Sequence, residues 1–225
     1  MSVTELKTTD RRIEDDPYYE ERVDLAAAFR MADRHGFHEA VANHFSLAVS
    51  DDGSKFLMNP CGRHFSRIRA SELLLIDAHD PTTMNQPNAP DQTAWSIHGA
   101  IHRNAPQARC LLHAHPKYTL ALACLGDPTM PAIDQNTARF FGRIAYDKGF
   151  KGMGLGAEAE RVGTQLGDNA IMMMGNHGIT VSRLPQIRSV MLLINSIISK
   201  KPVKRSSPPI PRANHSTFCQ TMSPD

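Results

Sequence analysis

Residues 109–116 form an apolar run that ends in two histidines one residue apart, a pattern suited to binding a metal ion. Successive side chains on a strand point to opposite faces, so His113 and His115 are predicted to project to the same side. His177 follows a second apolar run, residues 170–174, in a turn flanked by glycines. Three imidazoles with an open fourth position are typical of catalytic zinc and similar divalent ions.

Other polar residues in the sequence have two possible interpretations. His98 and His102 lie four residues apart in a predicted helix, a spacing that suits either a metal or hydrogen-bonded residues of a packing face. Asp134 and Gln135 either face a pocket or lie in a surface loop. The Asn-Pro-Cys-Gly segment at 59–62 is either an ordinary loop or a turn whose backbone N–H groups face a ligand.

Strands and helices must position these residues. The alternation of Phe45, Leu47 and Val49 predicts a strand over 43–50, which an Asp-Asp-Gly turn joins to a second strand near 55–58. Further strands are predicted at 70–77, which we expect to be buried, at 109–116 and at 170–174. Helices are predicted at 18–36, from a Thr93 cap onward, at 119–125, at 157–166 and through 184–198.

The first predicted helix has an expected apolar face, which comprises Val23, Ala26, Ala27, Arg30 and Met31. Glycines at 149, 152, 154 and 156 form a loop before the helix at 157–166. We expect no strand to precede this loop in the way a nucleotide site requires, and no Gly-Lys-Ser/Thr closes it. A nucleotide cofactor is therefore not indicated.

Length and composition suggest one domain in a cytoplasmic protein. The 225 residues suffice for a sizeable core, and a net charge of +2 with mixed signs favours neither nucleic acid nor a membrane surface. No apolar run approaches the ~20 residues that span a bilayer. The four cysteines show no close pairing pattern, so we expect reduced thiols. We predict a disordered arm (1–17), a domain (18–199, atypical after about 182) and a disordered basic tail (200–225).

Six segments together resemble the class II aldolase/adducin family, over about residues 25–181. They are Asn43-His-Phe-Ser46, Met58-Asn-Pro-Cys-Gly62, residues 70–77, Ile97-His-Gly-Ala-Ile-His102, Leu112-His-Ala-His-Pro116 and Gly175-Asn-His-Gly178, in the family's order. The resemblance implies an α/β protein, a single three-layer α/β/α domain with a central, mainly antiparallel sheet. It also implies a homotetramer with a small-molecule substrate.

The resemblance assigns roles to individual residues. His113, His115 and His177 would bind Zn²⁺, or else Mn²⁺ or Co²⁺, as a Lewis acid for an enediolate. Four further residues would line the pocket for the distal end of the substrate, which is a phosphate in the sugar-phosphate enzymes. They are Asn43, Ser46, Asn59 and Gly62.

The chain departs from the family pattern at the acid/base positions. Ala94 stands where the aldolases have a glutamate, and Gln135 beside Asp134 stands in place of the proton-donating tyrosine. Two serines that help to bind phosphate are replaced by Gln92 and Thr93. Losing a positioned general base typically costs ~10²–10⁴ in rate, so ordinary aldolase chemistry is not expected from the standard residues.

Three hypotheses follow for the function. In the first, Asp91, Asp134 or His98 substitutes as the base of a metal-dependent lyase-type enzyme, an aldolase or a related decarboxylase, epimerase or dehydratase. In the second, the chain is a non-catalytic, adducin-like protein-binding module. In the third, it is a defective product of an enzyme gene, because the helices that normally finish the domain are missing or rewritten after Ser182.

Overall fold

A seven-stranded sheet forms the centre of the computed structural model, which describes residues 13–149 and 154–182. The strand order is β3-β2-β1-β4-β7-β6-β5. The strands are β1 (His44–Ala48), β2 (Lys55–Met58), β3 (Leu74–Asp77), β4 (Cys110–Ala114), β5 (Ile144–Asp147), β6 (Ile171–Met174) and β7 (Gly178–Ser182). Only the β5–β6 pair is parallel among these strands, which confirms the prediction of a mainly antiparallel sheet.

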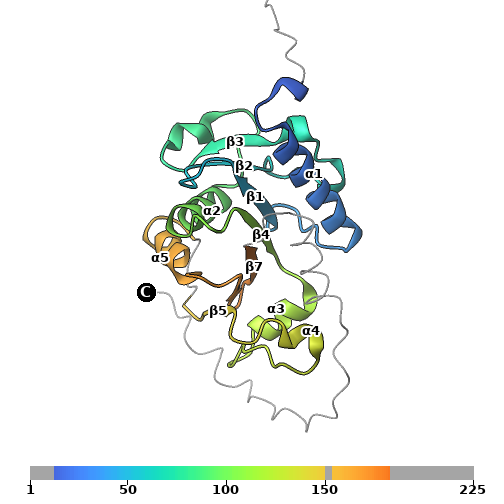
Figure 1. Ribbon diagram of the computed structural model, residues 1–225, viewed down its shortest axis with the longest axis vertical. Coiled ribbons are helices and arrows are strands. Elements are labelled where there is room, and N and C mark those ends of the chain that lie inside the picture. Colours follow the sequence, from blue (N-terminus) through green and yellow to red (C-terminus); the bar gives the residue numbers. More distant parts are fainter. Residues whose placement is uncertain (1–12, 150–153, 183–225) are drawn as a thin grey trace, which may run out of the picture.

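Helices cover both faces of the sheet and make three layers (Figure 1). The α-helices are α1 (Tyr19–Arg34), α2 (Gln92–Asn104), α3 (Lys117–Ala123), α4 (Gln135–Ala138) and α5 (Ala157–Gln165), and the 3-10 helices are η1 (Ile13–Asp15), η2 (Phe65–Arg67), η3 (Ala70–Glu72) and η4 (Pro81–Asn85). Leu112 joins the core under α1, whereas its neighbour Leu111 joins the core under α2 and α5. The predicted α/β/α architecture is confirmed.

The apolar face predicted for α1 is wrong at most of its positions, although Ala26 is buried as predicted. Val23 and Met31 are 38% and 37% exposed, and the buried face contains Leu25, Ala28, Phe29 and Ala32 instead. Phe29 fixes this orientation because its ring stacks on Phe45 of β1 at a centroid distance of 4.7 Å. Large aromatic rings contribute most to core packing, so Phe29 outweighs the smaller residues of the expected face.

Several predicted boundaries also shift. β3 begins at Leu74 because residues 70–72 form η3, and it is an edge strand with Leu75 39% exposed, not a buried one. β5, which was not predicted, does precede the glycine-rich loop; its four residues are too short to show a period. Asp91, not Thr93, caps α2 by accepting hydrogen bonds from the backbone N–H groups of residues 93 and 94.

Some expectations concern residues that the structure does not describe. These are residues 1–12 of the arm, the helix through 184–198 and the tail at 200–225. The described part of the arm includes η1. Three cysteines, Cys61, Cys110 and Cys124, carry free thiols, and no helix within the described residues is long and apolar enough to cross a bilayer.

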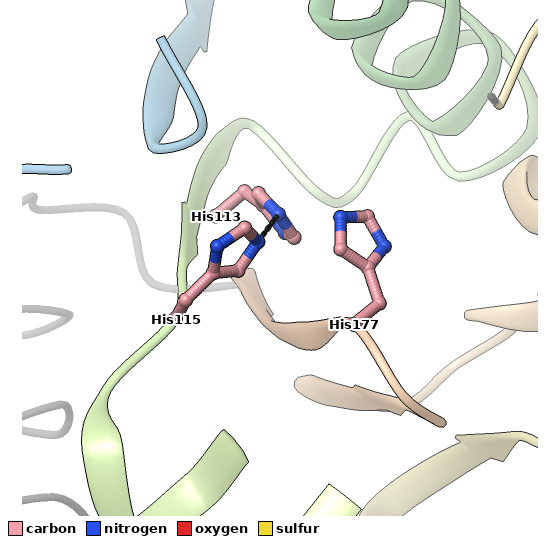
Figure 2. Close-up of side chains that lie close together, drawn as sticks. All are labelled: His113, His115 and His177. Atoms are coloured by element: carbon pink, nitrogen blue, oxygen red, sulfur yellow. Dashed lines mark hydrogen bonds between the residues drawn. The ribbon is translucent and has the colours of Figure 1, made fainter. Parts of the chain in front are cut away.

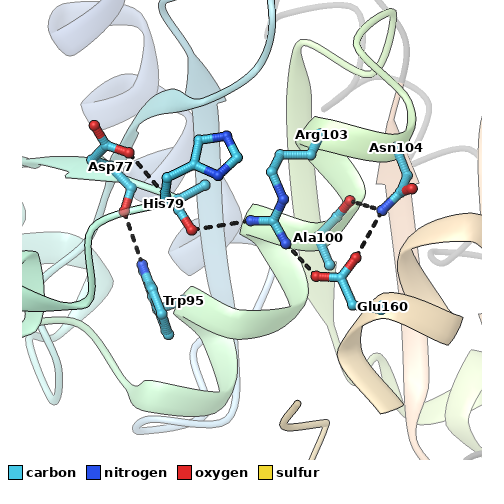
Figure 3. A network of polar contacts seen from close by, with 8 residues as sticks. Asp77, His79, Trp95, Ala100, Arg103, Asn104 and Glu160 are labelled. Atoms are coloured by element: carbon cyan, nitrogen blue, oxygen red, sulfur yellow. Dashed lines mark hydrogen bonds and ion pairs between the residues drawn. The ribbon is translucent and has the colours of Figure 1, made fainter. Parts of the chain in front are cut away.

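Close backbone packing fixes α2 against α5. A Cβ on Gly163 of α5 would lie 2.8 Å from the carbonyl carbon and oxygen of Ala100, so the two helices meet where only glycine fits. Polar contacts at the edge of this interface hold the same arrangement (Figure 3). Arg103 donates to the Ala78 carbonyl at 3.1 Å and pairs with Glu160 of α5. The buried side of α2, with His98 and His102, is thereby fixed over the sheet.

Candidate metal centre

Two neighbouring strands bring together the three predicted metal ligands. His113 lies on β4, His115 follows the end of β4, and His177 lies in the turn between β6 and β7. The pairing of β4 with β7 places this turn beside His113 and His115. One ring nitrogen from each histidine lies within 4.8 Å of the others, and the Nε2 atoms of His113 and His115 are 3.0 Å apart (Figure 2).

Two further side chains orient His113 and His115. The Nδ1 atom of His113 is 3.1 Å from Thr180 Oγ1, and that of His115 is 3.1 Å from a carboxylate oxygen of Glu39. A carboxylate can only accept a hydrogen bond from a histidine N–H, so His115 carries hydrogen on Nδ1 and a lone pair on Nε2 when neutral. Such partners of metal-binding histidines raise their affinity for the metal.

The turn after His177 has a steric reason for its glycine. A Cβ on Gly178 would lie 2.4 Å from Cδ2 of His115 and 2.8 Å from the Ala114 carbonyl oxygen. Asn176 adopts a left-handed φ of 56°, which asparagine tolerates better than most residues. The Asn-His-Gly sequence therefore builds the turn as well as supplying a ligand.

The electrostatic state of the site suits a cation. Burial lowers the pKa of His113 well below its ordinary value, and neighbouring histidines lower it further. Burial and His115 lower the pKa of His177 to about 4, against the opposing effect of Asp147 and Glu158. These two imidazoles are therefore neutral at pH 7, the state that binds a metal. The donor set, its spacing and its hydrogen bonds fit a divalent ion such as zinc.

The predicted substrate-binding residues lie in different environments. Asn43 is 2% exposed and supports the centre, because its Oδ1 accepts a hydrogen bond of 3.1 Å from the backbone N–H of His115. Ser46 is fully buried, and its hydroxyl lies between His98 and His102. Asn59 Oδ1 accepts from the Phe45 N–H at 3.3 Å. Gly62 is exposed, with a left-handed φ of 68°.

The predicted catalytic residues lie in different parts of the fold, and Asp91 is near enough to His44 to oppose the lowering of its pKa. His98 is fully buried with both ring nitrogens hydrogen-bonded, so its prediction as a base that contacts substrate is not supported. Asp91 caps α2, at 2.9 Å from the N–H of residue 93. Asp134 accepts a hydrogen bond of 2.8 Å from the Thr137 N–H, and Gln135 is exposed at the start of α4. Hydrogen bonds within the protein thus account for the placement of His98, Asp91 and Asp134.

A cavity of about 570 Å³ lies beside the centre and is lined by residues 35–39, Asn43, residues 115–118 and Leu120. Its position next to His115 makes it the natural space for a small ligand.

Three residues around the centre were missed from sequence: Glu39, His44 and Thr180. Of these, only His44 could have been predicted from the sequence, because strand alternation places it on the same face as Ser46. Glu39 lies in a loop and Thr180 within a buried strand, so no local pattern points to either one.

Comparison with known proteins identifies the family of most of the chain. Residues 23–183 match the model of the class II aldolase and adducin N-terminal domain. A Pseudomonas aeruginosa protein, provisionally named as an aldolase class 2 protein, is 30% identical over 162 residues, which are 72% of this chain and 61% of that protein. Adducin-related protein 1 of Caenorhabditis elegans is 28% identical over 166 residues, covering 72% of this chain and 22% of that protein.

A solved structure gives the same result at the level of the fold. The crystal structure of an aldolase II superfamily protein from Pseudomonas syringae superposes with a TM-score of 0.70 and 31% identity, covering 79% of this chain and 71% of that chain. The chain spans about six-tenths of the length of the first bacterial relative. On the family match, the sequence identity and the shared fold, the chain belongs to the class II aldolase and adducin N-terminal domain family.

Proposed function

We propose that the chain is a divalent-metal-dependent, lyase-type enzyme that acts on a small hydroxy-carbonyl or sugar-derived compound. The observation that carries the proposal is the convergence of three histidine nitrogens within 4.8 Å of one another, next to a cavity of about 570 Å³. Zn²⁺ is the first candidate, and Mn²⁺ and Co²⁺ suit the same ligand set. On the basis of the family match, we also propose that the protein is a cytoplasmic homo-oligomer.

The residues around the centre define what the protein itself contributes. A bound divalent ion would supply Lewis-acid polarisation of a carbonyl or hydroxyl oxygen. Glu39 and Thr180 hold the ligand rings of His115 and His113, and Asn43 fixes the backbone between β4 and α3. These contacts hold ligands in a fixed geometry before substrate arrives, which is how a protein pre-organises a reactive site.

The position of the usual acid/base glutamate is closed to proton transfer. Ala94 is fully buried in a core cluster with Phe56 and Met58. A methyl group there cannot accept a proton, so the proposed reaction differs from a standard aldol cleavage in its acid/base step. Related reactions, such as decarboxylation, epimerisation or dehydration, belong to the same proposal.

Metal content of the purified protein, measured by mass spectrometry, tests the proposal. We expect about one tightly held divalent ion per chain, which is lost in His113→Ala and kept in His79→Ala, a control that removes an exposed histidine outside the centre. The metal-loaded protein is then screened for turnover of hydroxy-ketones and keto-acids. A folded wild-type protein that binds no divalent ion would refute the enzyme proposal.

The alternative is a non-catalytic module that binds proteins, as its adducin-related relatives suggest. The buried Ala94 favours it, because it removes the usual proton acceptor without leaving a polar substitute at that position. The two proposals differ in the metal measurement, since a binding module needs no divalent ion. A metal-free but folded protein would favour the module.

A further inference from the structure

A continuous row of buried hydrogen bonds runs through the sheet–α2 interface to the edge of the metal centre. His102 Nδ1 lies 2.9 Å from the Ala108 carbonyl oxygen, and His102 Nε2 lies 2.8 Å from Ser46 Oγ. Ser46 Oγ is 2.5 Å from His98 Nδ1, and His98 Nε2 is 2.8 Å from His44 Nδ1. All four side chains are at most 6% exposed, so water does not compete for these bonds.

The first bond sets the direction of all the others. A carbonyl oxygen can only accept, so His102 carries its hydrogen on Nδ1 and a lone pair on Nε2. Ser46 must then donate its single hydrogen to His102 and accept from His98 Nδ1. His98 Nε2 is consequently an acceptor, and His44 must donate to it from Nδ1. A neutral His44 is therefore left with a lone pair on Nε2.

His44 stands directly beside a metal ligand. Its ring stacks on His113 at a centroid distance of 4.7 Å and an angle of 20°, and the two residues are cross-strand partners in β1 and β4. No hydrogen bond joins His44 Nε2 to another described residue. Burial lowers the pKa of His44 to about 3, which agrees with a neutral ring at pH 7.

We propose that this row of hydrogen bonds, which runs from Ala108 through His102, Ser46 and His98, holds His44 in the tautomer with hydrogen on Nδ1. His44 thereby presents Nε2 as a hydrogen-bond acceptor at the metal centre, for a hydroxyl group of the substrate. This role in substrate binding rests on the proposed enzyme function, whereas the tautomer lock does not. A lone pair accepts from an O–H group and repels a phosphate or carboxylate oxygen, so the inference favours a hydroxyl at this position of the ligand.

The tautomers can be read directly from ¹⁵N–¹H correlation spectra of the full chain with ¹⁵N-labelled histidine at pH 7.5. In the wild type we expect hydrogen on Nδ1 and a bare Nε2 in His44, His98 and His102. Ser46→Ala removes the link between His98 and His102. His102 should keep its tautomer, because the Ala108 carbonyl remains, while His98 and His44 should become mixtures of both forms.

Ser182→Ala is the matched control, since it removes another fully buried strand serine that makes only 3.4 Å contacts to backbone oxygens. It should leave all three tautomers unchanged. Hydrogen on Nε2 of wild-type His44 would overturn the proposal, and so would an unchanged His44 tautomer in Ser46→Ala. Metal content is measured on the same samples, so a failed lock in a metal-binding protein refutes this inference alone, and a metal-free protein refutes only the enzyme function.

Discussion

Replacing Thr180 by valine tests whether the contacts around the ligands matter to the metal centre. Thr180 is 1% exposed, and its hydroxyl lies 3.1 Å from Nδ1 of His113. The same hydroxyl points at the sulfur of Met174 at 3.5 Å, so its hydrogen is directed away from His113. Thr180 Oγ1 therefore accepts from His113 Nδ1–H, which leaves the His113 Nε2 lone pair for the metal. Valine has a similar shape and no hydroxyl.

Two effects of Thr180→Val can be estimated. The Nδ1–H group of His113, only 2% exposed as a residue, loses its partner, and an unsatisfied buried group costs about 1–3 kcal/mol in the free energy of unfolding. Mutation of a partner that orients a metal ligand typically lowers metal affinity ~10–100-fold. The second effect corresponds to about 1.4–2.8 kcal/mol of binding free energy.

Zinc affinity is measured by competition with a chromophoric chelator, and stability by urea unfolding of the metal-free protein. Thr119→Val is the matched control, because Thr119 is a buried threonine (5% exposed) on α3 that is not a ligand of the centre. We expect the control to keep its zinc affinity. If Thr180→Val binds zinc within about twofold of the wild type, the inferred orientation of His113 is wrong.

Three further changes have expected outcomes. Burial lowers the pKa of four histidines, which are His44, His98, His102 and His113. In the unfolded chain these histidines keep their ordinary pKa of 6.5 and take up protons as the pH falls, whereas in the folded state they stay neutral. Stability should therefore fall as the pH drops from 7.5 to 5.5, by roughly 1 kcal/mol for each such histidine, and a flat urea-unfolding profile would contradict this. Gly163→Ala places a Cβ 2.8 Å from the Ala100 backbone and should lower the free energy of unfolding, measured in urea, by about 1–3 kcal/mol. Gly167→Ala is the comparison, because its Cβ meets open space and the substitution tests only the strain of a left-handed φ. Zinc at about a thousand times its dissociation constant should raise the free energy of unfolding of the wild type by about 4 kcal/mol. Thermal unfolding should show this increase in the wild type and no increase in His113→Ala.

Sequence patterns were most informative where one element contains the whole signal. The His-x-His pair lies within a single strand and its continuation, and strand alternation alone places both rings on one side. The alternation of Phe45, Leu47 and Val49 correctly separated the face of β1 that packs in the core under α1. The sheet was likewise expected to be mainly antiparallel, though from the family resemblance.

Patterns misled where the answer depended on a partner element. The face of α1 was misjudged because the ring of Phe29 packs against Phe45 and Phe65, and no property of the helix alone reveals that contact. β5 escaped notice because four residues carry no clear period, although pairing with β6 stabilises them as a strand. His98 was one of three candidate bases because it lies near the ligands in sequence, but α2 packs it into the sheet with both ring nitrogens hydrogen-bonded, which is the other interpretation of this residue.

The sequence by itself determined the metal-ligand candidates and the family, because residue type and local spacing are sufficient for both. Only the tertiary structure decided what surrounds them. Glu39 approaches His115, Thr180 approaches His113, and the Ala108 carbonyl fixes the row of hydrogen bonds that ends at His44. These contacts join residues from separate elements, and side-chain hydrogen bonds depend on distances of about 3 Å that only the packing of strands and helices can set.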